Sequence, residues 1–243
     1  MKAWSLTDIG LKRIENEDFY FCDAEKGLFL IADGMGGHAG GEVASATAVK
    51  VVRDHFFGVT EENYRKEISG IFRLANQEIY QLAQRKKHLK GMGTTLAAAA
   101  VSGEHLFIGY VGDSRVYLYR NGDIRQLTED QNIAGQLVRS GELTEEEAME
   151  HPGKNLLTNA MGLHPDLEIA FCHEILEKDD ILLMCTDGLN SFLSSSELAQ
   201  IIHKYEKDLS KALDKMLKTA LERGGDDNIT IILTKNSWYE VKS

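Results

Sequence analysis

The chain has 243 residues, of which 43% are hydrophobic and 27% are charged, and this composition is typical of a folded globular protein. Lysine and arginine number 27 against 38 aspartate and glutamate residues, and the resulting net charge of −11 argues against nucleic-acid binding. The longest apolar stretch, around 96–101, is far shorter than the roughly 20 residues of a membrane-spanning helix. We therefore expect one domain over 1–243, without a membrane span or a nucleic-acid partner.

Two further features concern the cellular compartment. Cys22, Cys172 and Cys185 form no CxxC pair and lie in apolar segments, which favours reduced thiols in the core. The first residues lead directly into a strand-like segment, and no signal peptide is visible. We expect a cytoplasmic protein.

Hydrophobic periodicity and turn signals predict the secondary structure along the chain. The first half is expected to contain strands at 19–22 and 28–32, helices at 42–57 and 61–87, and strands at 94–101, 106–111, 116–119 and 123–127. The second half is expected to contain helices at 131–140 and 144–150, strands at 169–172 and 181–185, helices at 196–205 and 209–222, and a strand at 229–233. Strict alternation of strand and helix is absent, so an α+β architecture of mostly antiparallel sheets is expected.

Four aspartates stand at the ends of strongly apolar predicted strands. Asp33, Asp113 and Asp187 each follow such a strand, and Asp227 precedes the last one. Any one of them is well explained as a turn former, but four together indicate strand tips that meet at one edge. Two carboxylates about 6 Å apart repel by roughly 3 kcal/mol at an effective dielectric of 20, so such a cluster needs a cation. Donors that are all oxygen favour Mg²⁺ or Mn²⁺ over Zn²⁺.

A charged segment, 13–18, precedes the first strand of the predicted hairpin. Arg13 offers a planar guanidinium for a phosphoryl group, and Glu17 and Asp18 offer acceptors for metal-bound water. Taken alone, the segment fits a solvated charged turn better.

A glycine-rich loop, 34–41, joins an apolar strand to a predicted helix. Its spacing loosely matches a dinucleotide fingerprint and a phosphate loop, but the acidic residue of the first and the Lys-Ser/Thr of the second are missing. Backbone that approaches a metal, with the Gly34 carbonyl as a ligand, explains the loop better. His38 is a proton donor, a helix-start residue or a solvated loop residue, and the last two are favoured.

An ordered series of motifs resembles the bacterial metal-dependent serine/threonine protein phosphatases of the PPM, or type-2C, family. The motifs are Arg13 with Asn16-Glu17-Asp18, Asp33-Gly34-Met35-Gly36-Gly37-His38, Gly41-Glu42-Val43-Ala44-Ser45, Met92-Gly93-Thr94-Thr95, Gly112-Asp113-Ser114-Arg115, Leu127-Thr128, Gly141-Glu142-Leu143-Thr144, Glu147-Ala148, His151-Pro152, Asn159-Ala160-Met161-Gly162, Thr186-Asp187-Gly188-Leu189 and Asp227-Asn228-Ile229-Thr230. They run nearly from end to end of the chain, and their order and spacing make the resemblance very specific.

The resemblance implies a four-layer α-β-β-α sandwich of two antiparallel sheets flanked by helix pairs. It also implies two core Mn²⁺ or Mg²⁺ ions and a third ion of the kind seen in many bacterial members. The core ligands would be Asp33, the Gly34 carbonyl, Asp187 and Asp227, and the third ion would lie at Asp113 with Asp187.

Further roles are implied by the same resemblance. Arg13 would bind phosphate, Glu17 and Asp18 would hold metal-bound water, and about 128–163 would form a flap that influences substrate choice. Two positions depart from the family: Met35 stands where eukaryotic members carry histidine, and Gln131 stands where many relatives carry histidine after aspartate.

The implied activity is hydrolysis of phosphoserine and phosphothreonine in proteins by a metal-activated water. The implied partners are phosphorylated proteins and a cognate bacterial serine/threonine kinase, and a monomer is expected. Two alternatives stay open: a catalytically weak sensory or binding module of the same fold, and a hydrolase of small phosphoesters.

Overall fold

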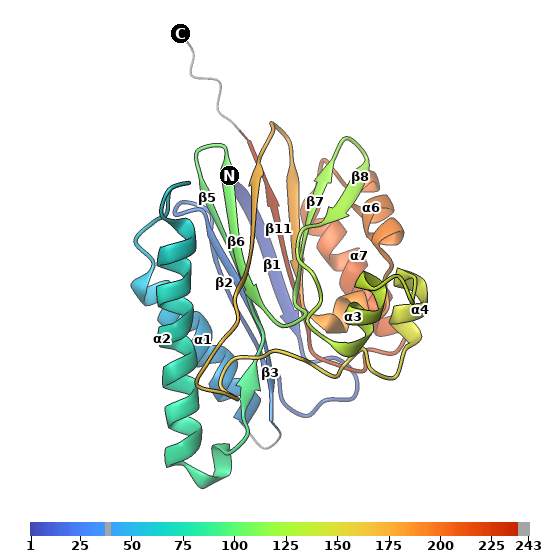
Figure 1. Ribbon diagram of the computed structural model, residues 1–243. Coiled ribbons are helices and arrows are strands. Elements are labelled where there is room, and N and C mark those ends of the chain that lie inside the picture. The colour runs from blue at the N-terminus through green and yellow to red at the C-terminus, as the bar shows by residue number, and fades with distance from the viewer. Residues whose placement is uncertain (37–39, 238–243) are drawn as a thin grey trace.

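Two antiparallel β-sheets stack face to face, and helices cover the outer face of each sheet (Figure 1). The structure is a computed structural model that describes residues 1–36 and 40–237. His38 lies outside the described residues, so its role stays a prediction.

The first sheet has five strands in the order β1-β11-β10-β7-β8, and all neighbours run antiparallel. Their bounds are Lys2–Asp8, Ile229–Lys235, Ile181–Cys185, Arg115–Arg120 and Asp123–Gln126. The second sheet has the order β2-β3-β5-β6-β9, with the short β4 beside β3. Its strands are Asp18–Asp23, Leu28–Met35, Leu96–Ser102, His105–Val111 and Ala170–Ile175, with β4 at Gly93–Thr94.

Helix pairs close the sandwich on both sides. Helices α1 (Gly40–His55) and α2 (Tyr64–Arg85) cover the second sheet, and α6 (Ser195–Lys204) and α7 (Leu209–Glu222) cover the first. The short helices α3 (Ile133–Arg139) and α4 (Glu145–Glu150) lie in the predicted flap, and a 3-10 helix spans Lys87–Leu89. The predicted α+β sandwich of two antiparallel sheets flanked by helix pairs is confirmed.

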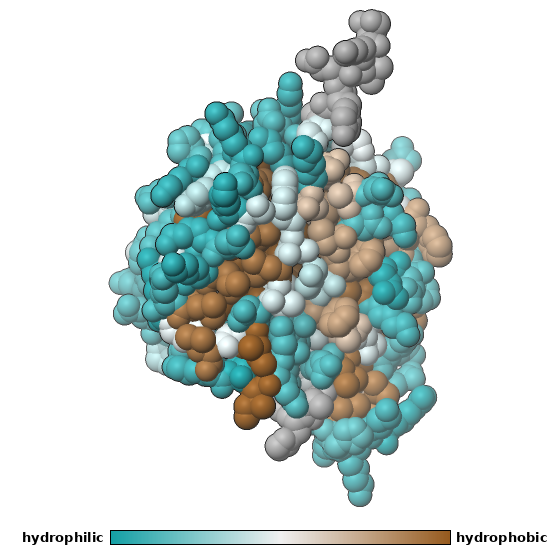
Figure 2. Space-filling view, turned by 180° about the vertical axis from the view of Figure 1, so that it is seen from behind, coloured by the Kyte–Doolittle hydropathy of each residue, from teal (hydrophilic) through white to brown (hydrophobic). Residues whose placement is uncertain are grey.

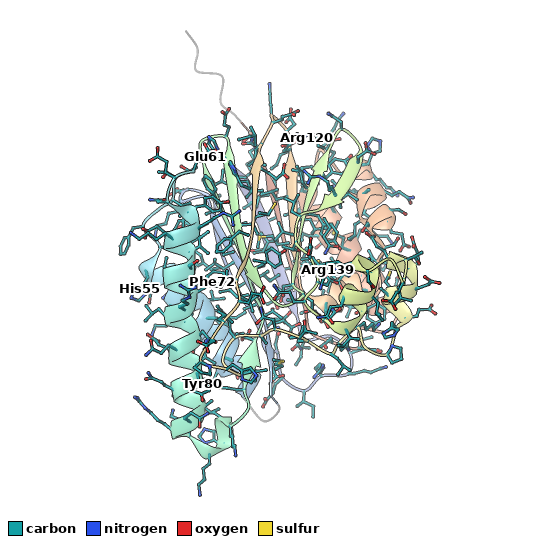
Figure 3. The ribbon with its side chains drawn as sticks, in the orientation of Figure 1. His55, Glu61, Phe72, Tyr80, Arg120 and Arg139 are labelled. Atoms are coloured by element: carbon teal, nitrogen blue, oxygen red, sulfur yellow. The ribbon has the colours of Figure 1, made fainter. Side chains whose placement is uncertain are left out.

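The alternation of side chains along each strand explains this layering. In β10, Ile181, Leu183 and Cys185 pack toward α6 and α7, whereas Leu182 and Met184 fill the space between the sheets. Both faces are buried, so the strand is a continuous apolar run although its neighbours are antiparallel. On the other side of the molecule, Phe72 points from α2 toward the second sheet and is 1% exposed (Figure 3).

Three local features differ from the predicted elements. Asp187 does not end a strand but begins the four-residue helix α5 (Asp187–Asn190). Strand β3 extends through Gly34 to Met35 because β4 pairs with that end. Strand β1 pairs with β11 over its whole length, and this long-range pairing turns a segment that is only strand-like in sequence into an edge strand.

The surface opposite to the view of Figure 1 is mostly hydrophilic, with hydrophobic side chains gathered in patches on its middle and lower parts (Figure 2). Within the residues that the structure describes, no helix is both long and apolar enough to cross a membrane.

Candidate metal centre

Strand directions bring the predicted aspartates to one end of the sandwich. Because β5 is antiparallel to both β3 and β6, these two strands end at the same edge, near Asp33 and Asp113. In the other sheet, the end of β10 meets the beginning of β11, which places Asp187 near Asp227. The strand ends next to the four predicted aspartates thus lie at one end of the sandwich, the lower end in Figure 1.

Asp18 adds a fifth carboxylate to this cluster. It is paired in register with Asp33 across the β2–β3 hairpin and is only 6% exposed. Its Oδ2 accepts hydrogen bonds from Thr230 Oγ1 at 2.6 Å and from Thr186 Oγ1 at 2.9 Å. The two threonines, for which the sequence predicts no role in the site, fix one oxygen of Asp18 and leave the other without a partner.

The proximity of these carboxylates shows in their pKa values. Burial raises the pKa of Asp33, and the neighbouring charges of Asp187, Asp18 and Asp227 raise it further. Burial and the charge of Asp187 likewise raise the pKa of Asp113. Asp33 and Asp113 resist ionisation next to the other carboxylates, so a cation in their midst would stabilise the ionised cluster.

Glycines at 34 and 41 let the backbone approach the cluster closely. A side chain at Gly34 would meet Gly41 O at 2.2 Å and Glu17 O at 2.5 Å. A side chain at Gly41 would meet the Glu17 carboxylate at 2.6 Å. The first turn of α1 therefore packs against the end of β3, with Glu17 between them. This close approach is the physical reason for glycine at positions 34 and 41.

Arg13 lies at the rim of the cluster. Its Nη2 donates to Asp227 Oδ2 at 2.6 Å, and its side chain is 48% exposed. The adjacent Lys12 pairs with Asp226 at 2.7 Å and is more exposed. Arg13 thus faces the cluster from the solvent side, where an incoming anion would meet it.

Asn228 holds the loop that carries Arg13. Its Nδ2 donates to Ile9 O and Glu15 O, and its Oδ1 accepts from Glu17 N at 2.8 Å. The sequence contains Asn228 in a recognised motif but gives no sign of this task, because the partners lie more than 200 residues away.

The chemistry of the donors fits a divalent cation. Asp18 Oδ1 and Asp187 Oδ1 are buried without a hydrogen-bond partner, which is costly unless something else satisfies them. As the side chains stand in residues 1–36 and 40–237, no three His, Cys, Asp or Glu side chains form a group that could hold a metal ion. In this arrangement Asp227 is paired with Arg13, and Asp113 Oδ2 accepts a hydrogen bond from Asn132 Nδ2.

A cavity of about 250 Å³ adjoins the cluster beneath the flap. Asp113 and Asp187 line it from the sandwich, and Lys154 and Arg139 line it from the flap. The predicted site residues that the structure describes therefore surround one end of the sandwich, and the flap lies beside them.

Comparison with known proteins matches this architecture. The sequence pattern described as Protein phosphatase 2C matches residues 12–229. The serine/threonine phosphatase stp of Listeria welshimeri is 37% identical over an alignment 248 residues long. The alignment covers 98% of this chain and 96% of that protein.

Solved structures agree. The Mycobacterium tuberculosis serine/threonine phosphatase PstP/Ppp superimposes with a TM-score of 0.90 at 31% identity, covering 98% of this chain and 99% of that chain. The catalytic domain of PstP in complex with 2 manganese ions matches with a TM-score of 0.85 at 31% identity, covering 96% of each chain. Family pattern, relative and structures all span nearly the whole chain, and so this chain belongs to the protein phosphatase 2C family.

Proposed function

We propose that this phosphatase hydrolyses phosphoserine and phosphothreonine in proteins at the carboxylate cluster. The observation that carries the proposal is the meeting of five buried or half-buried aspartates at one edge, two of them with an unpartnered oxygen. Cations stabilise such a cluster in its ionised form, and divalent cations with oxygen ligands are suited to phosphoryl transfer.

In this proposal Asp33, the Gly34 carbonyl, Asp187 and Asp227 hold two Mn²⁺ or Mg²⁺ ions, and Asp113 with Asp187 holds a third. Bound ions of this kind supply a water with a pKa lowered to about 7, a nucleophile at neutral pH. Glu17 and Asp18 orient water at the cluster, and the Arg13 guanidinium neutralises charge on the phosphoryl oxygens.

The decisive experiment is an assay with p-nitrophenyl phosphate, a phosphothreonine peptide and nucleotides, each with and without Mn²⁺. We expect Mn²⁺-dependent release of phosphate from the peptide. Release from nucleotides alone would favour the small-phosphoester hydrolase, and no release from any substrate would favour the sensory module.

The proposal extends to the surroundings of the enzyme. A cognate serine/threonine kinase would supply its phosphoproteins, and the single domain would act as a monomer. We also propose a cytoplasmic location, where reducing conditions keep Cys22, Cys172 and Cys185 as the free thiols that they are here.

Replacing Arg13 with alanine should weaken use of the phosphorylated substrate and leave the ions bound. A hydrogen bond to a charged group contributes roughly 1.5–3 kcal/mol, so kcat/KM for the phosphopeptide should fall on the order of tenfold to a hundredfold. Lys12→Ala is the matched control, because Lys12 is the neighbouring cation and pairs with Asp226 instead of Asp227. If calorimetry shows that Arg13→Ala has lost its ions, Arg13 supports the cluster and does not act on the substrate.

Divalent cations should raise the melting temperature, and more strongly at higher pH. Burial first, then neighbouring charge, raises the pKa of Asp113 to about 8, and burial raises the pKa of Asp18 to about 7. The folded protein therefore holds protons that the unfolded chain releases near pH 4, and the free energy of unfolding without cation falls as pH rises from about 4 to 8.

Mn²⁺ displaces these protons, so its stabilisation should grow over the same pH range. A ligand at 100 times its dissociation constant stabilises the folded state by about 2.7 kcal/mol. Differential scanning fluorimetry at pH 5.5 and pH 8, with EDTA or Mn²⁺, measures the effect. Identical melting curves in EDTA and Mn²⁺ at pH 8 would contradict a cation site in the cluster.

A further inference from the structure

Three consecutive residues near the start of the flap, Asp130, Gln131 and Asn132, are here called the flap root. Asn132 is buried, and its Nδ2 donates to Asp113 Oδ2 at 2.8 Å. Its Oδ1 accepts from Gly135 N at 2.7 Å, which caps the start of α3. One amide therefore caps a flap helix and holds a carboxylate of the cluster at the same time.

Gln131 makes a second link to the same loop. Its backbone N donates to Gly112 O at 3.1 Å, and its Oε1 accepts from Gly112 N at 2.8 Å. The same Oε1 accepts from Asn159 Nδ2 at 2.8 Å, and Gln131 O accepts from Thr158 N at 2.8 Å. Gln131 thus joins the outgoing and the returning ends of the flap to the residue that precedes Asp113.

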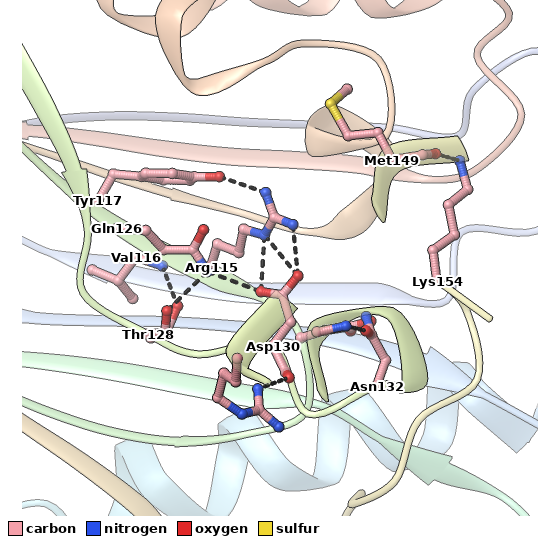
Figure 4. A network of polar contacts seen from close by, with 12 residues as sticks. Arg115, Val116, Tyr117, Gln126, Thr128, Asp130, Asn132, Met149 and Lys154 are labelled. Carbon is pink, nitrogen blue, oxygen red and sulfur yellow. Dashed lines mark hydrogen bonds and ion pairs between the residues drawn. The ribbon is translucent and has the colours of Figure 1, made fainter. Parts of the chain in front are cut away.

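Asp130 completes the contact from the other side of Asp113. Its carboxylate forms a bidentate ion pair with Arg115, with Nε at 2.9 Å from Oδ1 and Nη2 at 2.6 Å from Oδ2 (Figure 4). Gln126 Nε2 donates to Asp130 Oδ1, and Arg139 of α3 donates to Asp130 O. Each residue of the flap root therefore forms a hydrogen bond or an ion pair with the segment 112–115.

We propose that Asn132 and Gln131 are positioning residues that join the flap and the Asp113 side chain into one mechanical unit. Asn132 Nδ2 fixes Asp113 Oδ2 and leaves Oδ1 for a cation, while Gln131 fixes the backbone just before Asp113. Movement of the flap would displace the Asp113 carboxylate through its hydrogen bond with Asn132 Nδ2. Rotation of the carboxylate would in turn shift the Asn132 amide and disturb its cap on α3. The effect on turnover rests on the proposed function, but the link itself does not.

Hydrogen–deuterium exchange of the full chain without metal tests the link. Asn132→Ser keeps an oxygen that can cap α3 but is too short to reach Asp113. We expect faster exchange both in 131–139 and in 112–115, by roughly tenfold, as for the loss of one hydrogen bond to a charged group. Gln131→Leu, which removes the acceptor of Gly112 N, should have the same effect on 112–115 and serves as the second variant.

Thr144→Ala is the matched control within the flap. Thr144 caps α4 through a reciprocal pair of hydrogen bonds with Glu147 and lies outside the flap root. This variant should speed exchange in 145–150 alone. Unchanged exchange at 112–115 in both flap-root variants, or equally fast exchange there in Thr144→Ala, would overturn the proposal.

A Mn²⁺ titration of turnover separates positioning from a general loss of stability. With a phosphothreonine peptide, Asn132→Ser should raise the Mn²⁺ concentration for half-maximal kcat by about tenfold and leave the peptide KM nearly unchanged. Thr144→Ala should leave this Mn²⁺ midpoint where it is. A lower kcat at an unchanged midpoint would make Asn132 merely structural, whereas an inactive parent protein would overturn the proposed function and leave the exchange result intact.

Discussion

Replacing Asp187 with asparagine should abolish turnover while making the metal-free protein more stable at pH 8. After burial, the charge of Asp187 contributes most to the raised pKa values of both Asp33 and Asp113, so Asp187 is central to the cluster. A neutral amide is a poor ligand between cations. Losing Lewis-acid stabilisation of about 4 kcal/mol corresponds to roughly a thousandfold loss in kcat.

The same substitution should stabilise the metal-free protein, for a reason separate from its effect on turnover. Without cations, removing one of the crowded negative charges relieves repulsion, so the melting temperature in EDTA at pH 8 should rise. Asp226→Asn is the control, because Asp226 is exposed and pairs with Lys12 outside the cluster. Wild-type activity of Asp187→Asn at limiting Mn²⁺ would remove Asp187 from the proposed ligands.

Local sequence signals predict the helices and strands and the α+β class, whereas the four-layer sandwich is implied by the family resemblance. Periodicity in segments such as 42–57 and 209–222 reports a helix with one buried face, and runs such as 181–185 report buried strands. The structure has the helix at 209–222 and the strand at 181–185 with these bounds, and the first helix at Gly40–His55, two residues earlier than predicted. The strand ends of the four aspartates were equally visible, since each breaks an apolar run.

The partners of those aspartates were not predictable in the same way. Thr186 and Thr230 donate hydrogen bonds to Asp18, although they lie 168 and 212 positions away from it along the chain. Asn228 likewise donates a hydrogen bond to the backbone oxygen of Ile9, near the other end of the chain. Such contacts depend on strand order and register, which no local pattern encodes. Helix α5 was missed for a related reason: Asp187-Gly188 is a turn signal in sequence, and only the close packing of Gly188 on Asn228 O shows why the chain turns into a helix there.

Asn132 illustrates the same limit within the flap. The sequence predicts a helix over 131–140 that includes Asn132, whereas α3 begins at Ile133 and Asn132 is its N-cap. Its second bond, to Asp113, appears only when the flap folds back on the end of β6. Residues with two tasks are therefore the ones that pattern analysis undervalues.

Replacing Asp113 with alanine should separate the two core ions from the third. Asp113 is 5% exposed, and its carboxylate accepts a hydrogen bond from Asn132. It follows β6, whereas Asp33 and Gly34 lie at the end of another strand, β3. We expect the two core ions to stay bound and the fold to remain. Turnover of a phosphothreonine peptide should fall by a factor of about 10²–10⁴, which is typical of lost general acid–base assistance. Met35, the last residue of β3, has no proton to give, so the leaving oxygen depends on such assistance.

The substrate decides whether this assignment is right. The p-nitrophenolate leaving group needs little protonation, so Asp113→Ala should lose much less activity on p-nitrophenyl phosphate than on the peptide. Asp113→Asn keeps an acceptor for Asn132 Nδ2 and shows whether the loss of activity comes from the missing side-chain volume or from the missing charge. Asp123→Ala, at the exposed start of β8, is the neutral control. Equal losses on both substrates would exclude a role at the leaving group. Calorimetry that finds no bound ion in Asp113→Ala would instead place Asp113 among the ligands of the core ions, because a carboxylate that serves only an outer ion cannot be needed to retain the inner two.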